Sequence, residues 1–291
     1  MRFLFQNKRE PLSSHLFAII GILGITAFLG FDPAVAYVLK GPHILHLMVK
    51  QFGKADRLLV SQKLILKDNS TGQGPIEFEE IVRYTFPDSF RSDTSSGSTK
   101  RVHVSSKGDA ITIMDSKISS EPESEYDLYK DLLLYHSRIM LQNRLIMLGV
   151  DVELSSVGRF QNKIAYIIGA EYPDETRSQV WIDKDSFRPI RWLLMKSGSA
   201  GNGTVMEFRY GMWQQIDSLP YPMQIQIFQD GFLIREINAD ILTVNPSFEA
   251  ALFDIEYLKT QYEADLSGEI KNDGIEEVQK TIQEFKKRYQ Q

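Results

Sequence analysis

The sequence predicts an α+β protein in which about ten antiparallel strands form one large sheet around an enclosed helix. Apolar and polar residues alternate with a period of two in most segments between residues 58 and 243, which is typical of strands with one buried face. Two links, at residues 183–186 and at Asp230-Gly231, are short enough to join sequential antiparallel neighbours. A sheet with that many strands must curl, so we expect a concave face.

Two internal helices are expected, one over residues 42–57 and a longer one over about 123–148. Two apolar stripes cover more than half of the circumference of the longer helix, so we expect it to be buried on several sides. A further amphipathic helix over 273–290 follows a linker, which gives a main domain over 37–260 and an appendage over 261–291. The predicted strands are 58–67, 76–86, 88–94, 99–105, 109–114, 151–159, 162–171, 177–183, 187–196, 203–211, 222–230 and 232–243.

The first 36 residues have the pattern of an export signal. Basic residues at positions 2, 8 and 9 precede an apolar run over 16–31, which is shorter than the roughly 20 residues that span a bilayer. The run ends before Ala34-Val35-Ala36, the small-x-small pattern that signal peptidase reads. We therefore expect cleavage after Ala36 and a periplasmic protein. An uncleaved anchor would place the domain in the same compartment.

Composition argues against several classes of function. The net charge of −5 gives no basic face for nucleic acid and no polybasic patch for an anionic membrane. The chain has no cysteine, which excludes disulfides, thiolate metal sites, a Cys nucleophile and a lipidated N-terminal Cys. A large exported domain without disulfides must depend on its hydrophobic core.

Residues that could support catalysis do not form a recognisable site. The pair His43 and His46 has a metal-like spacing but no carboxylate to complete it, and a lone His136 on the long helix is more typical of a hydrogen-bonded core residue. No G-x-S-x-G elbow is present, and the nearest segment, 197–201, is a turn between strands. The acidic clusters at 77–80 and 121–125 are typical of solvated faces. We therefore expect no enzyme activity, no metal and no cofactor.

Instead, the sequence has an excess of apolar residues on the predicted concave face. Such residues form an ordinary core where they are covered by a helix, and a ligand site where they lie near an open rim. Flexible Met and large aromatic side chains suit an adaptable apolar pocket. The candidate ligand-binding residues are Phe78, Val82, Tyr84, Leu132, Ile139, Val180, Ile182, Ile190, Trp192, Phe208, Tyr210, Ile225 and Ile227.

Five short motifs occur in order over residues 42–258. They are Phe86-Pro87-x-x-Phe90-Arg91, Lys107-Gly108-Asp109-Ala110-Ile111, Val180-Trp181-Ile182-Asp183 followed by Pro189-Ile190-Arg191, Tyr210 with Trp213 and Leu219-Pro220-Tyr221-Pro222, and Asn245 with Phe248 to Phe253. Together they resemble the LolA-type periplasmic lipoprotein carriers, the outer-membrane lipoprotein-sorting superfamily. One departure is that many of these carriers place an Arg before the Pro of the first motif, where this chain has Phe86.

The resemblance implies an incomplete antiparallel β-barrel of about ten to eleven strands, capped by helices and enclosing an apolar cavity. It also implies a non-enzymatic carrier that binds the acyl chains of lipids or lipoproteins and shuttles them toward the outer membrane, with an inner-membrane donor protein and an outer-membrane acceptor protein as partners. The helices 42–55 and 124–148 would form a lid. Two alternatives remain: an envelope sensor of the same fold that binds a lipid or peptide signal and a membrane partner, and a structural envelope protein with a filled core.

Overall fold

The computed structural model describes residues 38–67, 74–97, 99–196 and 203–264. The expected export signal, the 197–201 turn and the helix over 273–290 lie outside these residues. In the described part of the chain, no helix is both long enough and apolar enough to cross a bilayer.

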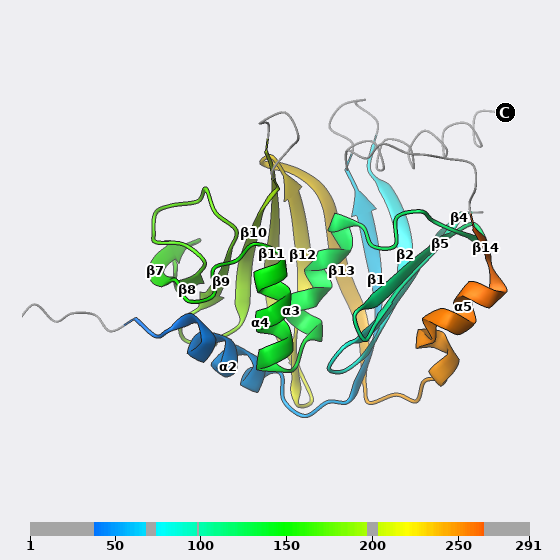
Figure 1. The fold of residues 1–291 in the computed structure, drawn as a ribbon, viewed down its shortest axis with the longest axis horizontal. Coiled ribbons are helices and arrows are strands. Elements are labelled where there is room, and N and C mark those ends of the chain that lie inside the picture. Colours follow the sequence, from blue (N-terminus) through cyan, green and yellow to red (C-terminus); the bar gives the residue numbers. More distant parts are fainter. Residues whose placement is uncertain (1–37, 68–73, 98, 197–202, 265–291) are drawn as a thin grey trace, which may run out of the picture. The chain divides into compact units, whose positions relative to one another are not determined.

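Within the described residues, fourteen strands form a single open sheet with the order β14-β6-β5-β4-β3-β2-β1-β13-β12-β11-β10-β9-β8-β7. Neighbours are antiparallel except for the parallel pair β14 and β6. Figure 1 shows the sheet with helices in front of it. The strands are β1 Arg57–Leu66, β2 Ile76–Thr85, β3 Ser89–Ser96, β4 Thr99–Ser106, β5 Asp109–Met114, β6 Lys117–Ile118, β7 Ser155–Phe160, β8 Lys163–Ile168, β9 Gln179–Asp183, β10 Pro189–Lys196, β11 Thr204–Ile216, β12 Leu219–Gln229, β13 Phe232–Val244 and β14 Glu263–Ala264.

The predicted count of about ten to eleven strands is wrong, although the antiparallel sheet is confirmed. The two-residue strands β6 and β14 are too short to show any alternation. The hairpin of β11 and β12 also extends further than predicted, because Pro220 and Pro222 made its end resemble a loop. In the structure these prolines pair with Gln215 and Trp213.

The topology joins two antiparallel meanders. Strands β1 to β6 form one and β7 to β13 form the other, and β13 returns to pair with β1 over most of its length. The connection between the meanders carries three helical elements: η1 Glu125–Lys130, α3 Asp131–Leu134 and α4 Arg138–Met147. This connection therefore runs from one edge of the sheet to the other (Figure 1).

The predicted continuous helix over 123–148 is wrong, because the helical connection is broken between α3 and α4. Tyr135 leaves helical geometry with ψ of 88°, and Ser137 is extended and begins α4. Serine favours such a cap position because its side chain competes with the helical backbone. At the start of the connection, Ser124 and Asp127 form a capping box.

Three further helices complete the described fold: α2 Gly41–Gln51, η2 Ala250–Phe253 and α5 Ile255–Gln261. Helix α2 contacts α4 and strand β8 on the same side as the helical connection. Helix α5 lies on the other side, where Ile255 and Leu258 pack on Ile111 and Ile113 of β5. The main core therefore lies between the concave face of the sheet and the layer formed by α2, η1, α3 and α4.

Candidate ligand-binding site

The structure brings all but two of the candidate ligand-binding residues into one cluster on the concave face. Strand alternation places the sheet residues there, because residues two apart on a strand share a face, whereas Leu132 reaches the cluster from helix α3. Cross-strand pairing then aligns them in rows, as in Val180 opposite Trp192 and Phe208 opposite Ile227. The cluster contains Phe78, Val82, Tyr84, Leu132, Val180, Ile182, Trp192, Phe208, Tyr210, Ile225 and Ile227.

Ile139 and Ile190 are not brought to the concave face. A register shift between Pro189 and Arg191 turns Ile190 to the opposite face, where it packs with Trp181. Ile139 lies on α4 and its side chain is 61% exposed. Both differences arise from tertiary structure. The bulge turns Ile190 to the opposite face of the sheet, and the packing of α4 on the core decides that Ile139 is on its uncovered side.

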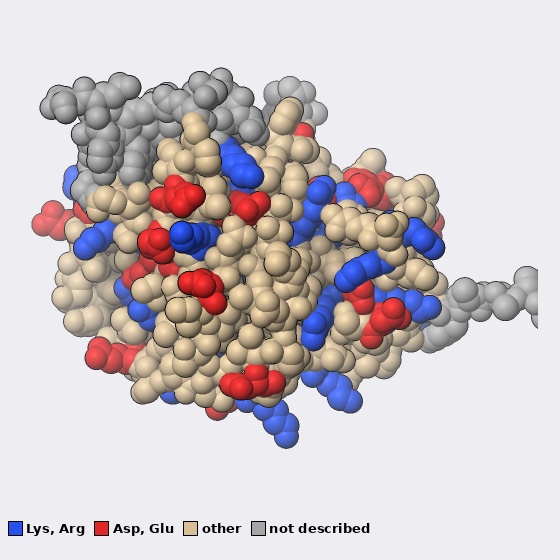
Figure 2. All heavy atoms as spheres, turned by 180° about the vertical axis from the view of Figure 1, so that it is seen from behind, with Lys and Arg blue, Asp and Glu red and all other residues tan. Residues whose placement is uncertain are grey.

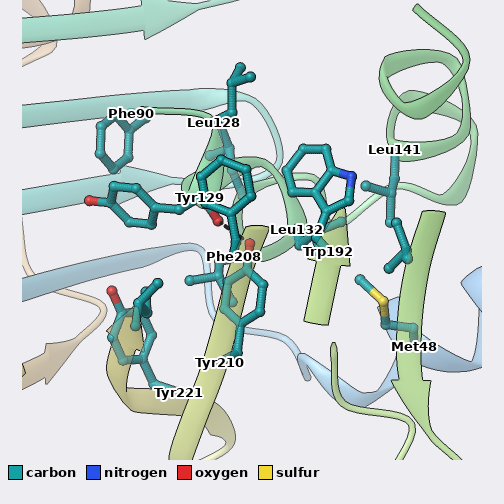
Figure 3. Packing of buried hydrophobic residues seen from close by; sticks show 14 of the residues in the cluster. Met48, Phe90, Leu128, Tyr129, Leu132, Leu141, Trp192, Phe208, Tyr210 and Tyr221 are labelled. Atoms are coloured by element: carbon teal, nitrogen blue, oxygen red, sulfur yellow. Dashed lines mark hydrogen bonds between the residues drawn. The ribbon is translucent and has the colours of Figure 1, made fainter. Parts of the chain in front are cut away.

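In this conformation the helices pack directly on the candidate residues. Leu128, Tyr129 and Leu132 of the helical connection lie against Trp192 and Phe208 of the sheet (Figure 3). The rings of Trp192 and Phe208 are 5.3 Å apart, and both side chains are fully buried. The expected lining of an open cavity is therefore the floor of a closed core.

Buried tyrosine hydroxyls fix this closed arrangement. Tyr210 Oη donates a 2.9 Å hydrogen bond to the carbonyl oxygen of Tyr129, which joins β11 to η1. Tyr126 Oη donates to Gln229 Oε1 at 2.9 Å and joins η1 to β12. Burial raises the pKa of Tyr84, Tyr129 and Tyr210 well above the usual value, so these hydroxyls are neutral.

A buried ionic group holds the parts of the helical connection together. Lys130 Nζ lies 2.6 Å from Glu123 Oε1 and 3.1 Å from Asp131 Oδ1, while Arg144 of α4 contacts the same two carboxylates at 2.7 and 2.6 Å. Burial alone would lower the pKa of Lys130, but the carboxylates of Asp131 and Glu123 outweigh it and raise the pKa above the usual value. The two cations likewise overcome burial and lower the pKa of Glu123.

A second ionic contact joins the helical connection to the sheet. Arg101 of β4 binds Asp127 in a bidentate pair at 3.2 and 2.5 Å. His103, fully buried beside it, shares a 3.0 Å hydrogen bond with Thr112 Oγ1. Burial lowers the pKa of His103 to about 4, so its ring is neutral. None of these residues was predicted to contribute to the site.

The break between α3 and α4 is held by stacked rings. His136 lies between Phe86 of the β2–β3 turn, at 3.7 Å between ring centroids, and Phe52 at the end of α2, at 5.0 Å. Burial lowers the pKa of His136 to about 4. The expectation of a hydrogen-bonded histidine is confirmed, since its Nε2 lies 3.1 Å from the carbonyl oxygen of Leu133. Phe86, which occupies the position where many LolA-type carriers have Arg, therefore makes an aromatic contact at the break.

Glu80 corrects the expectation that the acidic cluster at 77–80 is solvated. It shares the concave face with Phe78 and Val82 and is 5% exposed. Its carboxylate accepts hydrogen bonds from Gln62 Nε2 at 2.6 Å, from Ser92 Oγ, and from Thr94 Oγ1 at 3.2 Å. The alternation of strand β2 could have revealed this, because Glu80 occupies an inward position.

A cleft of about 530 Å³ lies away from the concave core, between the ends of β2 to β5 and the segment containing η2 and α5. It includes Phe248 and Phe253, which belong to the last of the five motifs. Charged residues of both signs, such as Arg57, Lys107 and Glu256, also line it. This mixed lining differs from the apolar surface expected for an acyl-chain site.

Comparison with solved structures defines the class of fold. A domain from Vibrio parahaemolyticus, described as an outer membrane lipoprotein-sorting protein domain, is 13% identical and aligns over 75% of this chain and 97% of its own, with a TM-score of 0.50. A LolA superfamily protein from Nitrosomonas europaea is 10% identical and aligns over 76% of this chain and 100% of its own, also with a TM-score of 0.50. No protein-family model matches the sequence, and neither does any curated protein sequence. The resemblance found in the motifs is confirmed at the level of the fold alone: the chain shares its fold with these two structures.

Proposed function

We propose that the protein is a non-enzymatic periplasmic carrier, which holds the acyl chains of a lipid or lipoprotein between the concave face and its helical layer and delivers them toward the outer membrane. The observation that carries the proposal is the large apolar face covered by a layer whose main connection is interrupted at residues 135–137. The break allows α3 and α4 to change their relative orientation once the contacts of Arg144 with Asp131 and Glu123 open, which a continuous helix would resist.

The energetics are compatible with reversible loading. Burial of each methylene contributes about 0.8 kcal/mol, so a single long acyl chain supplies on the order of 10 kcal/mol of gross driving force. Part of that free energy is spent on displacing side chains such as Leu128 and Leu132 from Trp192 and Phe208. The net affinity is therefore moderate, as a carrier that must release its cargo requires.

The test uses the absence of native cysteine to lock the helical layer. Glu125 at the start of η1 and Lys196 at the end of β10 form an ion pair, and their side chains are 28% and 61% exposed, so cysteines there should leave the core intact. The Glu125→Cys/Lys196→Cys protein is joined by a short bismaleimide, and uptake of a fluorescent phospholipid is measured. We expect the joined protein to lose uptake, while both single variants treated with the same reagent retain it.

Equal uptake by the joined and unjoined proteins would contradict entry beneath the helical layer. Native mass spectrometry of the unjoined protein provides the second measurement. Co-purifying lipid supports the carrier, whereas a stoichiometric protein partner without lipid would favour the sensor.

A further inference from the structure

We infer that the outer side of helices α2 and α4 is a docking surface for an anionic lipid bilayer. The first observation is the exposed apolar side of α4. Ile139, Ile146 and Met147 are 61%, 51% and 72% exposed. Ile146 and Met147 follow Ile139 by seven and eight residues, so the three lie on one side of the helix, together with the exposed Asn143. Leu141 and Leu145, on the opposite side, are fully buried in the core. Helix α4 therefore has apolar side chains both toward the core and on its outer side. This pattern is typical of a helix whose outer side is also covered by a partner.

The second observation is the charge of the two helices, which pack on one another. Neither Gly41–Gln51 nor Arg138–Met147 contains Asp or Glu, although the chain carries a net charge of −5. Lys50 and Arg138 are exposed, and His43 and His46 lie on the exposed side of α2 with their rings stacked at 6.3 Å. By contrast, the face of the protein seen from behind the sheet mixes acidic and basic side chains (Figure 2).

The net charge predicts no polybasic patch, and the structure shows only two exposed cations on these helices, Lys50 and Arg138, but these flank exposed apolar side chains. That combination matches the chemistry of an anionic bilayer surface. The apolar groups enter the boundary between headgroups and acyl chains, while the cations bind the headgroups. A second copy of this chain fits less well, because a symmetric contact would place two cationic helix pairs against each other. The carboxylates of Glu123 and Asp131 contact Arg144 of α4 and neutralise it, so the exposed cations of the two helices are Lys50 and Arg138. Asp56, Asp151 and Glu153 follow the ends of the two helices in the sequence.

Docking in this orientation would place the layer that covers the concave core against the membrane. The inference stands without the carrier proposal, since a protein can bind a bilayer surface whether or not it extracts lipid. The two proposals also have separate tests. The cross-linked protein tests entry of lipid beneath the helices, and vesicle binding tests the outer side of the same helices.

The experiment measures flotation of the purified protein with vesicles of phosphatidylcholine, with and without phosphatidylglycerol. The full-length gene is expressed, and the protein is used in the form that the cell produces, with its N-terminus determined by mass spectrometry. We expect binding to vesicles that contain phosphatidylglycerol, weakening as salt rises. The Ile139→Ser/Ile146→Ser/Met147→Ser protein and the Lys50→Glu/Arg138→Glu protein should each bind at least about tenfold more weakly.

The matched control is Met212→Ser/Phe232→Ser, which removes apolar side chains that are 67% and 65% exposed on other elements. It should bind like the unchanged protein. All substituted positions are exposed, and circular dichroism verifies folding. Binding that does not depend on phosphatidylglycerol, or an equal loss in the control, would overturn the inference. The inference would also be overturned if the protein failed to bind vesicles, formed a dimer in solution, and became monomeric in the α4 variant.

Discussion

Substitution of Lys130 by Met gives the most direct test of the buried ionic group. Lys130 is 1% exposed and Asp131 is fully buried, whereas Glu123 and Arg144 are 22% and 20% exposed, so the two carboxylates and two cations form a group that is largely shielded from water. Lys130→Met keeps most of the apolar volume but leaves two carboxylates to a single cation. Loss of one partner from a buried pair costs about 3–5 kcal/mol. We expect about 3 kcal/mol, since Arg144 still contacts Asp131 and Glu123 at 2.6 and 2.7 Å.

Equilibrium unfolding in urea, followed by tryptophan fluorescence, measures this loss. The double variant Lys130→Met/Asp131→Asn restores the balance of one carboxylate and one cation, and we expect it to recover about 1–2 kcal/mol relative to Lys130→Met. Lys196→Met is the control, because its ion pair with Glu125 is exposed and should contribute less than about 1 kcal/mol. A loss below about 1 kcal/mol for Lys130→Met, or no recovery in the double variant, would refute this account of the group.

Two other predictions concern pH and backbone packing. Burial holds the pKa values of His103 and His136 near 4, below their unfolded value of about 6.5. The unfolded state therefore binds more protons between these values, so stability is complete above about pH 6.5 and falls toward pH 4, by at most about 3 kcal/mol for each histidine. The melting temperature measured from pH 6.5 to pH 4 follows this loss of stability. His136→Phe keeps the ring stack, so we expect its melting temperature to fall less over this range. An equal fall in the variant would exclude His136 as a contributor. Gly41→Ala would place Cβ 2.1 Å from the carbonyl oxygen of Val152 and should lower the melting temperature by several degrees. At Gly74 an added Cβ would have no atom within 4 Å, so Gly74→Ala should leave the melting temperature unchanged. Equal changes in melting temperature for the two variants would contradict the steric explanation.

Local patterns were sufficient for most of the sheet. Alternation in strands such as β2 and β11 places apolar residues on one face, and this pattern needs no knowledge of neighbouring strands. The short links at residues 183–186 and 230–231 then predict antiparallel neighbours. The same alternation placed ten of the thirteen candidate residues on one face of the sheet, and Leu132 of α3 packs against them.

Features that depend on register or on distant partners were not predictable in this way. A single bulge in β10 moves Ile190 to the opposite face, because it adds one residue to a period of two. At the interruption after Leu134, His136 stacks on Phe86 and Phe52, which are far from it in the chain.

The sequence by itself determined that the chain forms an antiparallel sheet with one apolar face, because hydrophobic period is a local property. The tertiary structure decided how the predicted helices cover that face. Four charged residues of the helical connection meet in one largely buried group, and α2 and α4 turn apolar and basic side chains outward. Such arrangements depend on contacts between segments that are distant in sequence, since burial and charge pairing are properties of the packed chain.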